Sequence, residues 1–192
     1  MALSQRRRFD QRGAIMTHGS GESVGEPGSV RLAVSQRGRF PVAASVAAIE
    51  DLAWLGEPLA PGPDLGPWRR VKSVLALPVT DGSAPGPLHK SALIDVGPLE
   101  RLGSSVRAAI GWQSDSVAPL FPVFAGRLTI QPDLLSLEGD YAPPLGRIGL
   151  LIDERILHFV ARRTAQAFLA RVAARLETAP GPTGDGPSGS LE

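Results

Sequence analysis

Few side chains in this sequence of 192 residues are of the types that perform nucleophilic or metal chemistry. The sequence contains no cysteine, which excludes thiolate nucleophiles, disulfides and cysteine-based zinc or iron–sulfur sites. Its three histidines, His18, His89 and His158, do not fall at the spacing of a metal-ligand pair. Neither a glycine-rich phosphate loop nor a Gly-x-Ser-x-Gly motif is present. The sequence therefore predicts no metal site and no cofactor, and it does not support the common nucleotide-binding and hydrolase classes.

His158 is placed for acid–base chemistry, because Asp153 and Glu154 precede it by five and four residues in a predicted helix. A solvated histidine at a helix edge is the commoner explanation of such a residue. The carboxylates of Glu138 and Asp140 share one strand face, but the alternation of that strand places this face outside the apolar interior. No residue is therefore assigned a catalytic role.

The candidate ligand-binding residues are mostly apolar and are predicted to face the interior. Tyr141 is the only tyrosine, and its inward position means that its hydroxyl either orients a ligand or reaches the rim of the sheet. An apolar face under a helix is core by default, and only a cavity larger than packing requires would make it a site. The other candidate wall residues are Trp112, Phe124, Ile130 and Phe168.

Two glycines and one connection complete the candidate site. Gly126 and Gly139 are predicted to lie opposite each other on the inward face, and three explanations stay open: a ligand fills the space, the long helix approaches, or the strand bulges. The connection at 116–122 is rich in apolar residues, which need a place to pack because loops generally run over the surface. Leu120 and Phe121 would either cap the cavity as a gate or complete the core as a plug.

The elements that must position these residues follow from the spacing of apolar side chains. Alternation of apolar and polar residues predicts strands, and recurrence at helical spacing predicts helices. Residues 56–67 are rich in proline and glycine and are expected to be irregular. The predicted elements are a strand at 30–35, a helix of about fourteen residues between Pro41 and Gly56, strands at 70–79, 89–96, 105–113, 124–131 and 135–141, and a long helix at 148–177.

The last two predicted strands form a hairpin whose register can be derived. If inward residues pair and the loop is short, the residue numbers of each pair sum to 265. Arg127 then lies opposite Glu138 on the solvent face, where opposite charges contribute about 0.2–1 kcal/mol. The inward pairs are Ile130 with Leu135, Leu128 with Leu137, and Phe124 with Tyr141.

The order of these elements defines the fold class. A doubly wound parallel sheet needs a helical crossover between successive strands, and most of these strands lack one. We expect an α+β fold, a curved antiparallel sheet of about six strands packed around the long C-terminal helix. The apolar stripe of that helix contains Leu157, Ala161, Thr164, Ala165, Phe168, Val172 and Leu176. The domain is expected at 29–177, between a flexible leader at 1–28, with Met16 as an alternative start, and a disordered tail at 178–192.

Composition limits the partners. The 20 basic and 19 acidic residues give a net charge of +1, so no overall field collects nucleic acid or anionic membrane. No window approaches the roughly 18 uninterrupted apolar residues of a membrane span, and no apolar stretch follows the N-terminal arginines as in a signal peptide. We expect a cytoplasmic protein without an integral membrane segment.

The pattern along residues 29–177 resembles the SRPBCC superfamily, which includes START domains and polyketide cyclase-like proteins. The most specific stretches are Leu120 to Phe124, Leu135 to Gly146, Leu157 to Ala161 and Phe168 to Arg171. The resemblance implies a helix-grip fold, in which a curved sheet grips the C-terminal helix and leaves a deep apolar cavity. It also implies a lipid, polyketide or other hydrophobic ligand. The superfamily hosts carriers, enzymes and regulators, so no one activity follows.

Three functions are compatible with these observations. The preferred one is a binding or carrier protein for a hydrophobic small molecule, because the inward positions offer Tyr141 as their main titratable group. The second is a cyclase- or dehydratase-like enzyme that uses the same cavity. The third is a dimerising accessory protein without a small ligand, which would have a filled core and an exposed apolar patch.

Overall fold

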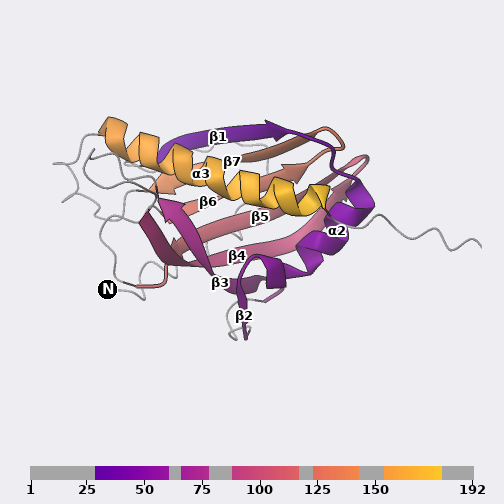
Figure 1. Cartoon of the computed structure of the whole chain (residues 1–192), viewed down its shortest axis with the longest axis horizontal. Helices are drawn as coiled ribbons and strands as arrows, with labels where there is room; N and C mark the ends of the chain where they lie inside the picture. Colours follow the sequence, from indigo (N-terminus) through magenta and orange to yellow (C-terminus); the bar gives the residue numbers. More distant parts are fainter. Residues whose placement is uncertain (1–28, 61–65, 78–87, 117–122, 143–153, 179–192) are drawn as a thin grey trace, which may run out of the picture.

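A computed structural model describes residues 29–60, 66–77, 88–116, 123–142 and 154–178 (Figure 1). The leader, the tail from residue 179 onward and the expected gate at Leu120 and Phe121 lie outside the described residues. The elements in chain order are β1 (Val30–Arg37), α2 (Val42–Glu50), the 3-10 helix η1 (Leu52–Trp54), β2 (Glu57–Leu59), β3 (Arg69–Leu77), β4 (Leu88–Leu102), β5 (Ser105–Ser114), β6 (Val123–Ile130), β7 (Leu134–Ala142) and α3 (Glu154–Glu177).

The strands form one antiparallel sheet in the order β1-β7-β6-β5-β4-β3-β2. Helix α3 lies across one face of this sheet, with β1 along one side and α2 near its C-terminal end (Figure 1). Its most extensive contacts with strands are to β1 and β3, which are far apart in the strand order. The sheet therefore curves around the helix, and the predicted α+β class with a C-terminal helix on an antiparallel sheet is confirmed.

The described sheet has seven strands, one more than expected. The additional strand is β2, which pairs with β3 and lies in the segment that was predicted to be irregular. Three residues are too few to display an alternating pattern, so the sequence carries no periodic signal for it. Pro58 is tolerated there because β2 is an edge strand and one side of its backbone needs no ladder hydrogen bond.

Helix α2 has nine residues instead of the expected fourteen or so. It ends at Glu50 because Asp51 adopts an extended conformation, with φ −91° and ψ 94°. The side chain of Asp51 then accepts a hydrogen bond from the backbone N–H of Ala53 and starts η1. The chain therefore changes direction where the apolar spacing alone suggested a continuous helix.

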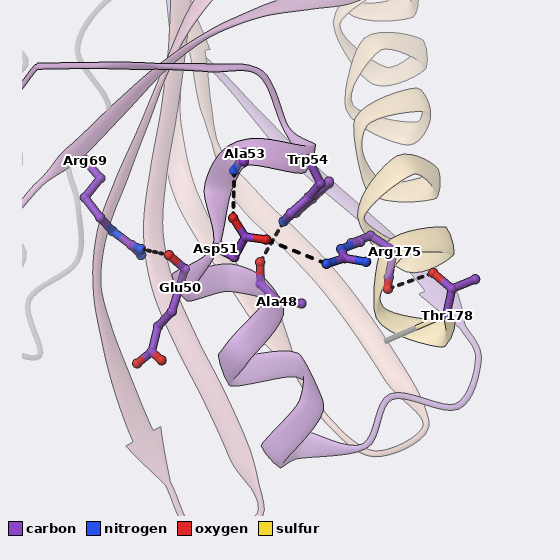
Figure 2. A network of polar contacts seen from close by, with 8 residues as sticks. All are labelled: Ala48, Glu50, Asp51, Ala53, Trp54, Arg69, Arg175 and Thr178. Carbon is purple, nitrogen blue, oxygen red and sulfur yellow. Dashed lines mark hydrogen bonds and ion pairs between the residues drawn. The ribbon is translucent and has the colours of Figure 1, made fainter. Parts of the chain in front are cut away.

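Side chains from outside α2 satisfy its last carbonyl groups, as Figure 2 shows for most of them. Nε1 of Trp54 donates to the carbonyl of Ala48 at 2.6 Å. The guanidinium of Arg69 donates to the carbonyls of Glu50 at 2.7 Å and Ile49 at 3.1 Å. Helix ends leave such carbonyls without partners inside the helix, so these bonds stabilise the early end of α2.

The C-terminal half of α3 is joined to the same region by two arginines. Arg171 donates to the hydroxyl of Ser73 at 3.1 Å and to the carbonyl of Trp54 at 3.0 Å. Arg175 forms an ion pair with Asp51 at 3.8 Å (Figure 2). These contacts fix where α3 lies over β3 and η1. They therefore also fix which residues of α3 point toward the sheet.

Strand β4 continues well beyond the predicted end at residue 96. It runs for 15 residues, and its register with β5 shifts between Val96 and Leu99. Gly97 and Pro98 lie at this shift, and such irregularities bend a strand and increase its twist. The sequence indicated a strand end because glycine and proline interrupt the alternation.

The derived register of the β6–β7 hairpin is confirmed. Arg127 lies opposite Glu138, and both side chains are exposed on the face away from α3. The inward pairs are Phe124 with Tyr141, Gly126 with Gly139, Leu128 with Leu137, and Ile130 with Leu135.

Candidate functional site

Three aromatic residues lie side by side across the inner face of the sheet, which is the face packed against α3. Trp112 of β5 is opposite Phe124 of β6, and Phe124 is opposite Tyr141 of β7. At most 2% of each residue is exposed. We call these three residues the aromatic row. Each lies within two residues of one end of its strand, so the row is close to the rim of the sheet.

Helix α3 crosses above the aromatic row. The ring centroid of Phe168 is 5.4 Å from that of Trp112, and the ring centroid of His158 is 6.2 Å from that of Tyr141. The helix therefore runs from β7 at His158 to β5 at Phe168. Between these two contacts, the fully buried residues of the helix are all small: Ala161, Thr164 and Ala165.

The ring of Phe124 occupies the space beside the glycine pair. A methyl group on Gly126 would lie 2.6 Å from Cζ of Phe124, and one on Gly139 would lie 2.8 Å from the same atom. The hairpin register continues through the pair, so there is no bulge at this point. Phe124 also stacks on Trp112, with ring centroids 4.2 Å apart and 18° between the ring planes. The glycines make room for Phe124, which corrects the three explanations expected from the sequence.

Ile130 is buried on the inner face, but the structure does not place it with the aromatic row. It pairs with Val106 and Leu135 and lies six residues from Phe124. At about 3.3 Å per residue, that separation is roughly 20 Å along β6. Phe121 is the remaining candidate from the sequence, and it lies outside the described residues.

Two polar atoms are buried beside the aromatic row. Among the residues that the structure describes, none forms a hydrogen bond with Nε1 of Trp112 or with Oγ1 of Thr164. Thr164 lies four residues before Phe168 on the buried side of α3, and Phe168 contacts Trp112. Both atoms therefore belong to the layer between α3 and the strands of the aromatic row, β5, β6 and β7. The signal in the sequence was a threonine in an otherwise apolar helical stripe.

Tyr141 and His158 are two ionisable residues next to this layer, and their rings are neighbours. The acid–base partners expected for His158 were Asp153 and Glu154, but Asp153 and the side chain of Glu154 lie outside the described part of the chain. Glu138 is exposed on the outer face, opposite the face that α3 covers. The acidic residues of β7 are therefore not part of the candidate site.

A buried ion pair on the outer face was not anticipated from the sequence. The guanidinium of Arg70 donates to both carboxylate oxygens of Asp95, at 2.5 and 2.7 Å, and Asp95 is 2% exposed. This bidentate geometry joins β3 to β4. An aspartate within the apolar run of β4 was the available signal, but its partner is 25 residues away.

A second ion pair joins β3 to the end of β5 near the rim. Nζ of Lys72 is 2.7 Å from Oδ2 of Asp115, and the hydroxyl of Ser91 donates to that oxygen at 3.2 Å. The hydrogen bond from Lys72 lowers the pKa of the Asp115 carboxyl below its usual value of about 3.8. The same hydrogen bond raises the pKa of Lys72 above its usual value of about 10.5.

Two other kinds of site find no support in the described part of the chain. No helix there is both long and apolar enough to cross a membrane. No three histidine, aspartate or glutamate side chains within the described ranges are grouped in a way that would hold a metal ion.

Comparison with known proteins supports the fold. No protein-family model matches the sequence, and no curated protein matches it significantly. Among solved structures, the fold is similar to that of the protein TTHA0849 from Thermus thermophilus, with a TM-score of 0.50 and 14% sequence identity. The match covers 79% of this chain and 100% of that chain. At this level of identity the likeness establishes a shared fold alone.

Proposed function

We propose that this protein binds or carries a hydrophobic small molecule, of lipid or polyketide type, between α3 and the inner face of the sheet. The observation that carries the proposal is the aromatic row beneath the small buried residues of α3, close to the rim of the sheet. Ligand sites of this kind are mainly apolar and aromatic, with a few polar groups that fix orientation. The scaffold is, in this proposal, the helix-grip fold of the SRPBCC superfamily.

The arrangement of α3 supports the proposed place of binding. The helix is in extensive contact with β1 and β3, whereas β5, the middle strand of the described sheet, contacts it through the large side chain of Trp112. A ligand that displaces side chains of the aromatic row would therefore leave the contacts of the helix with β1 and β3 in place. The bonds that Arg171 makes to Ser73 and Trp54 hold the C-terminal half of α3 while the ligand enters.

A cyclase- or dehydratase-like enzyme is the second candidate, and one observation favours it. Tyr141 and His158 are ring neighbours at one end of the aromatic row, and both residue types act as general acids or bases. An enzyme would need more convergent titratable groups than this pair, which is why binding is preferred. Turnover of an aromatic polyketide analogue that disappears in His158→Gln, with ligand binding retained, would favour the enzyme.

Quenching of tryptophan fluorescence tests the binding proposal. Methyl dibromoundecanoate carries bromine atoms that quench an indole on contact, and methyl undecanoate is the matched ligand without bromine. We expect saturable quenching by the brominated ester alone, and its loss in Trp112→Phe, which retains Trp54 and Trp68. Equal quenching in the two proteins would place the ester elsewhere. Absence of binding to the wild-type protein, together with a purified protein that carries no lipid-like molecule in native mass spectrometry, would contradict the proposal.

A further inference from the structure

The hydrogen-bonding state of two buried side chains indicates what chemical group the ligand carries. The indole Nε1 of Trp112 is a donor only, and within the described residues it has no acceptor. A threonine inside a helix commonly donates its hydroxyl to the carbonyl four residues earlier. Oγ1 of Thr164 makes no such bond, nor any other with the described part of the protein. Burial of a polar group without a partner costs free energy, so each such atom requires an explanation.

Position separates these two atoms from the other buried polar atoms in the same state. Ser45 belongs to α2, Arg107 to the outer face of β5, and Arg175 to the C-terminal end of α3. Trp112 on β5 and Thr164 on α3 instead lie on the two sides of one layer. This placement follows because Phe168, one turn after Thr164, contacts the Trp112 ring. Two hydrogen-bond donors thus remain available in the layer where the ligand is proposed to lie.

The charges of the buried side chains limit which kind of acceptor group on the ligand these two donors would meet. Apart from Asp95, which is paired with Arg70 on the outer face, the described part of the chain has no fully buried charged side chain. A buried carboxylate without a cation is strongly disfavoured, whereas a neutral carbonyl needs only donors. The site therefore suits a ketone or ester oxygen on an apolar molecule better than a free carboxylate.

Resting on the proposed function, we infer that Nε1 of Trp112 and Oγ1 of Thr164 donate hydrogen bonds to a neutral carbonyl oxygen of the bound hydrophobic ligand. The ligand class is then an apolar, ring-bearing or alkyl ketone or ester rather than a hydrocarbon or a fatty acid anion. The neighbouring rings of Phe124 and Phe168 contact its apolar body.

A matched pair of ligands tests this inference by calorimetric titration. Acetylnaphthalene and ethylnaphthalene have nearly the same shape, and only the first has a carbonyl oxygen. We expect the wild-type protein to bind the ketone about tenfold more tightly, the size of one or two well-made neutral hydrogen bonds. That preference should fall toward unity in Trp112→Phe and in Thr164→Val, each of which removes a donor and keeps the shape.

The control variants are Trp68→Phe and Thr129→Val. Trp68 lies beside Gly97 and Ala109, and Thr129 alternates with two buried residues of β6, so both are on the outer face. Each should keep the tenfold preference. The carbonyl stretching frequency of carbon-13-labelled acetylnaphthalene gives a second measurement, because hydrogen bonding lowers it. We expect the lowered frequency in the wild-type complex and its return toward the free value in Thr164→Val.

The outcomes separate this inference from the function on which it rests. Equal affinities of the wild-type protein for the two ligands would overturn the inference and leave hydrophobic binding in place. A preference that persists unchanged in both Trp112→Phe and Thr164→Val would also overturn it. If the wild-type protein binds neither ligand, the proposed function fails and the inference fails with it. Should Trp112→Phe not fold, Thr164→Val decides the matter on its own.

Discussion

Thr164 places a hydroxyl where its neighbours on the helix, Ala161 and Ala165, are small and apolar. A buried hydroxyl without a hydrogen bond loses its hydration and gains nothing in return. If its role is to meet a ligand, the residue should weaken the ligand-free protein. The same side chain would then serve binding at the expense of stability, as is common for residues in functional sites.

Thr164→Val should therefore stabilise the ligand-free protein. The substitution replaces the hydroxyl by a methyl group of similar size, and removal of an unsatisfied buried polar group is worth about 1–3 kcal/mol. We expect the free energy of unfolding in urea to rise by about 1 kcal/mol. Thr129→Val, whose hydroxyl is on the outer face, is the control and should change little. A loss of stability in Thr164→Val would mean that the hydroxyl has a partner in the folded protein.

Sequence and structure agree on the face of the sheet that the aromatic row occupies. Strand alternation correctly placed Trp112, Phe124 and Tyr141 on one face, because parity in a strand is a local property. It could not anticipate that the Phe124 ring would fill the space beside Gly126, since that depends on a side-chain conformation. Nor could it reveal the hydrogen-bonding state of Nε1 in Trp112, which depends on every residue around it.

At the scale of elements, the β6–β7 hairpin depends on the glycine pair at its centre. A methyl group at Gly126 would overlap the carbonyl oxygen of Glu138 and the ring of Phe124. The first of these atoms belongs to the hydrogen-bonded backbone of β7 and cannot move without disturbing the ladder. The hairpin and the aromatic row therefore share one steric constraint.

Gly126→Ala should destabilise the protein by about 1–3 kcal/mol, the usual cost of overpacking, measured by urea unfolding. The control is Gly97→Ala at the register shift of β4. A methyl group there would lie 3.3 Å from Cβ of Ala109 and 3.5 Å from the Trp68 ring, so it would need only a small adjustment. Equal losses in the two variants would show that the steric overlap at Gly126 is not the cause.

Elements differed in how far the sequence could predict them. The hairpin register was derivable because inward parity and the charge pair of Arg127 with Glu138 agree on one alignment. The end of α2 was not, because Arg69, which binds its last carbonyls, is about twenty residues away. Strand β2 forms because β3 offers a free edge. Its own three residues carry no pattern that predicts a strand.

At the scale of the whole molecule, the ion pair of Lys72 with Asp115 connects β3 to the end of β5 beyond the strand between them. Because Lys72 lowers the pKa of Asp115, the folded protein binds that proton less readily than the unfolded chain does. The resulting stabilisation is present above the unfolded pKa and is lost as the pH falls through the lower folded pKa. The pKa of Lys72 is raised in the folded protein, so the stabilisation that Lys72 contributes is lost only when the pH rises through this raised pKa.

Asp115→Asn should remove the acidic part of this dependence. We expect the variant to be less stable than the wild type near neutral pH, and the difference to vanish as the pH is lowered well below about 3.8. Urea unfolding at a series of pH values measures it. Asp133→Asn, at an exposed turn, is the control. A difference that stays constant down to the lowest pH would mean that the ionised carboxylate is not what stabilises the fold.

Strand β1 is the first of the described strands to be synthesised, yet its only partner in the described sheet is β7, whose Tyr141 lies opposite Val30. On the order of a hundred residues must therefore be synthesised before β1 can pair, and contacts so distant in sequence form late. The hairpins from β3 to β7 join neighbours in the chain and need no such wait. We expect pulsed hydrogen exchange during refolding to protect the amides of β5 and β6 before those of β1. During synthesis, the described sheet would then be completed only once β7 has left the ribosome.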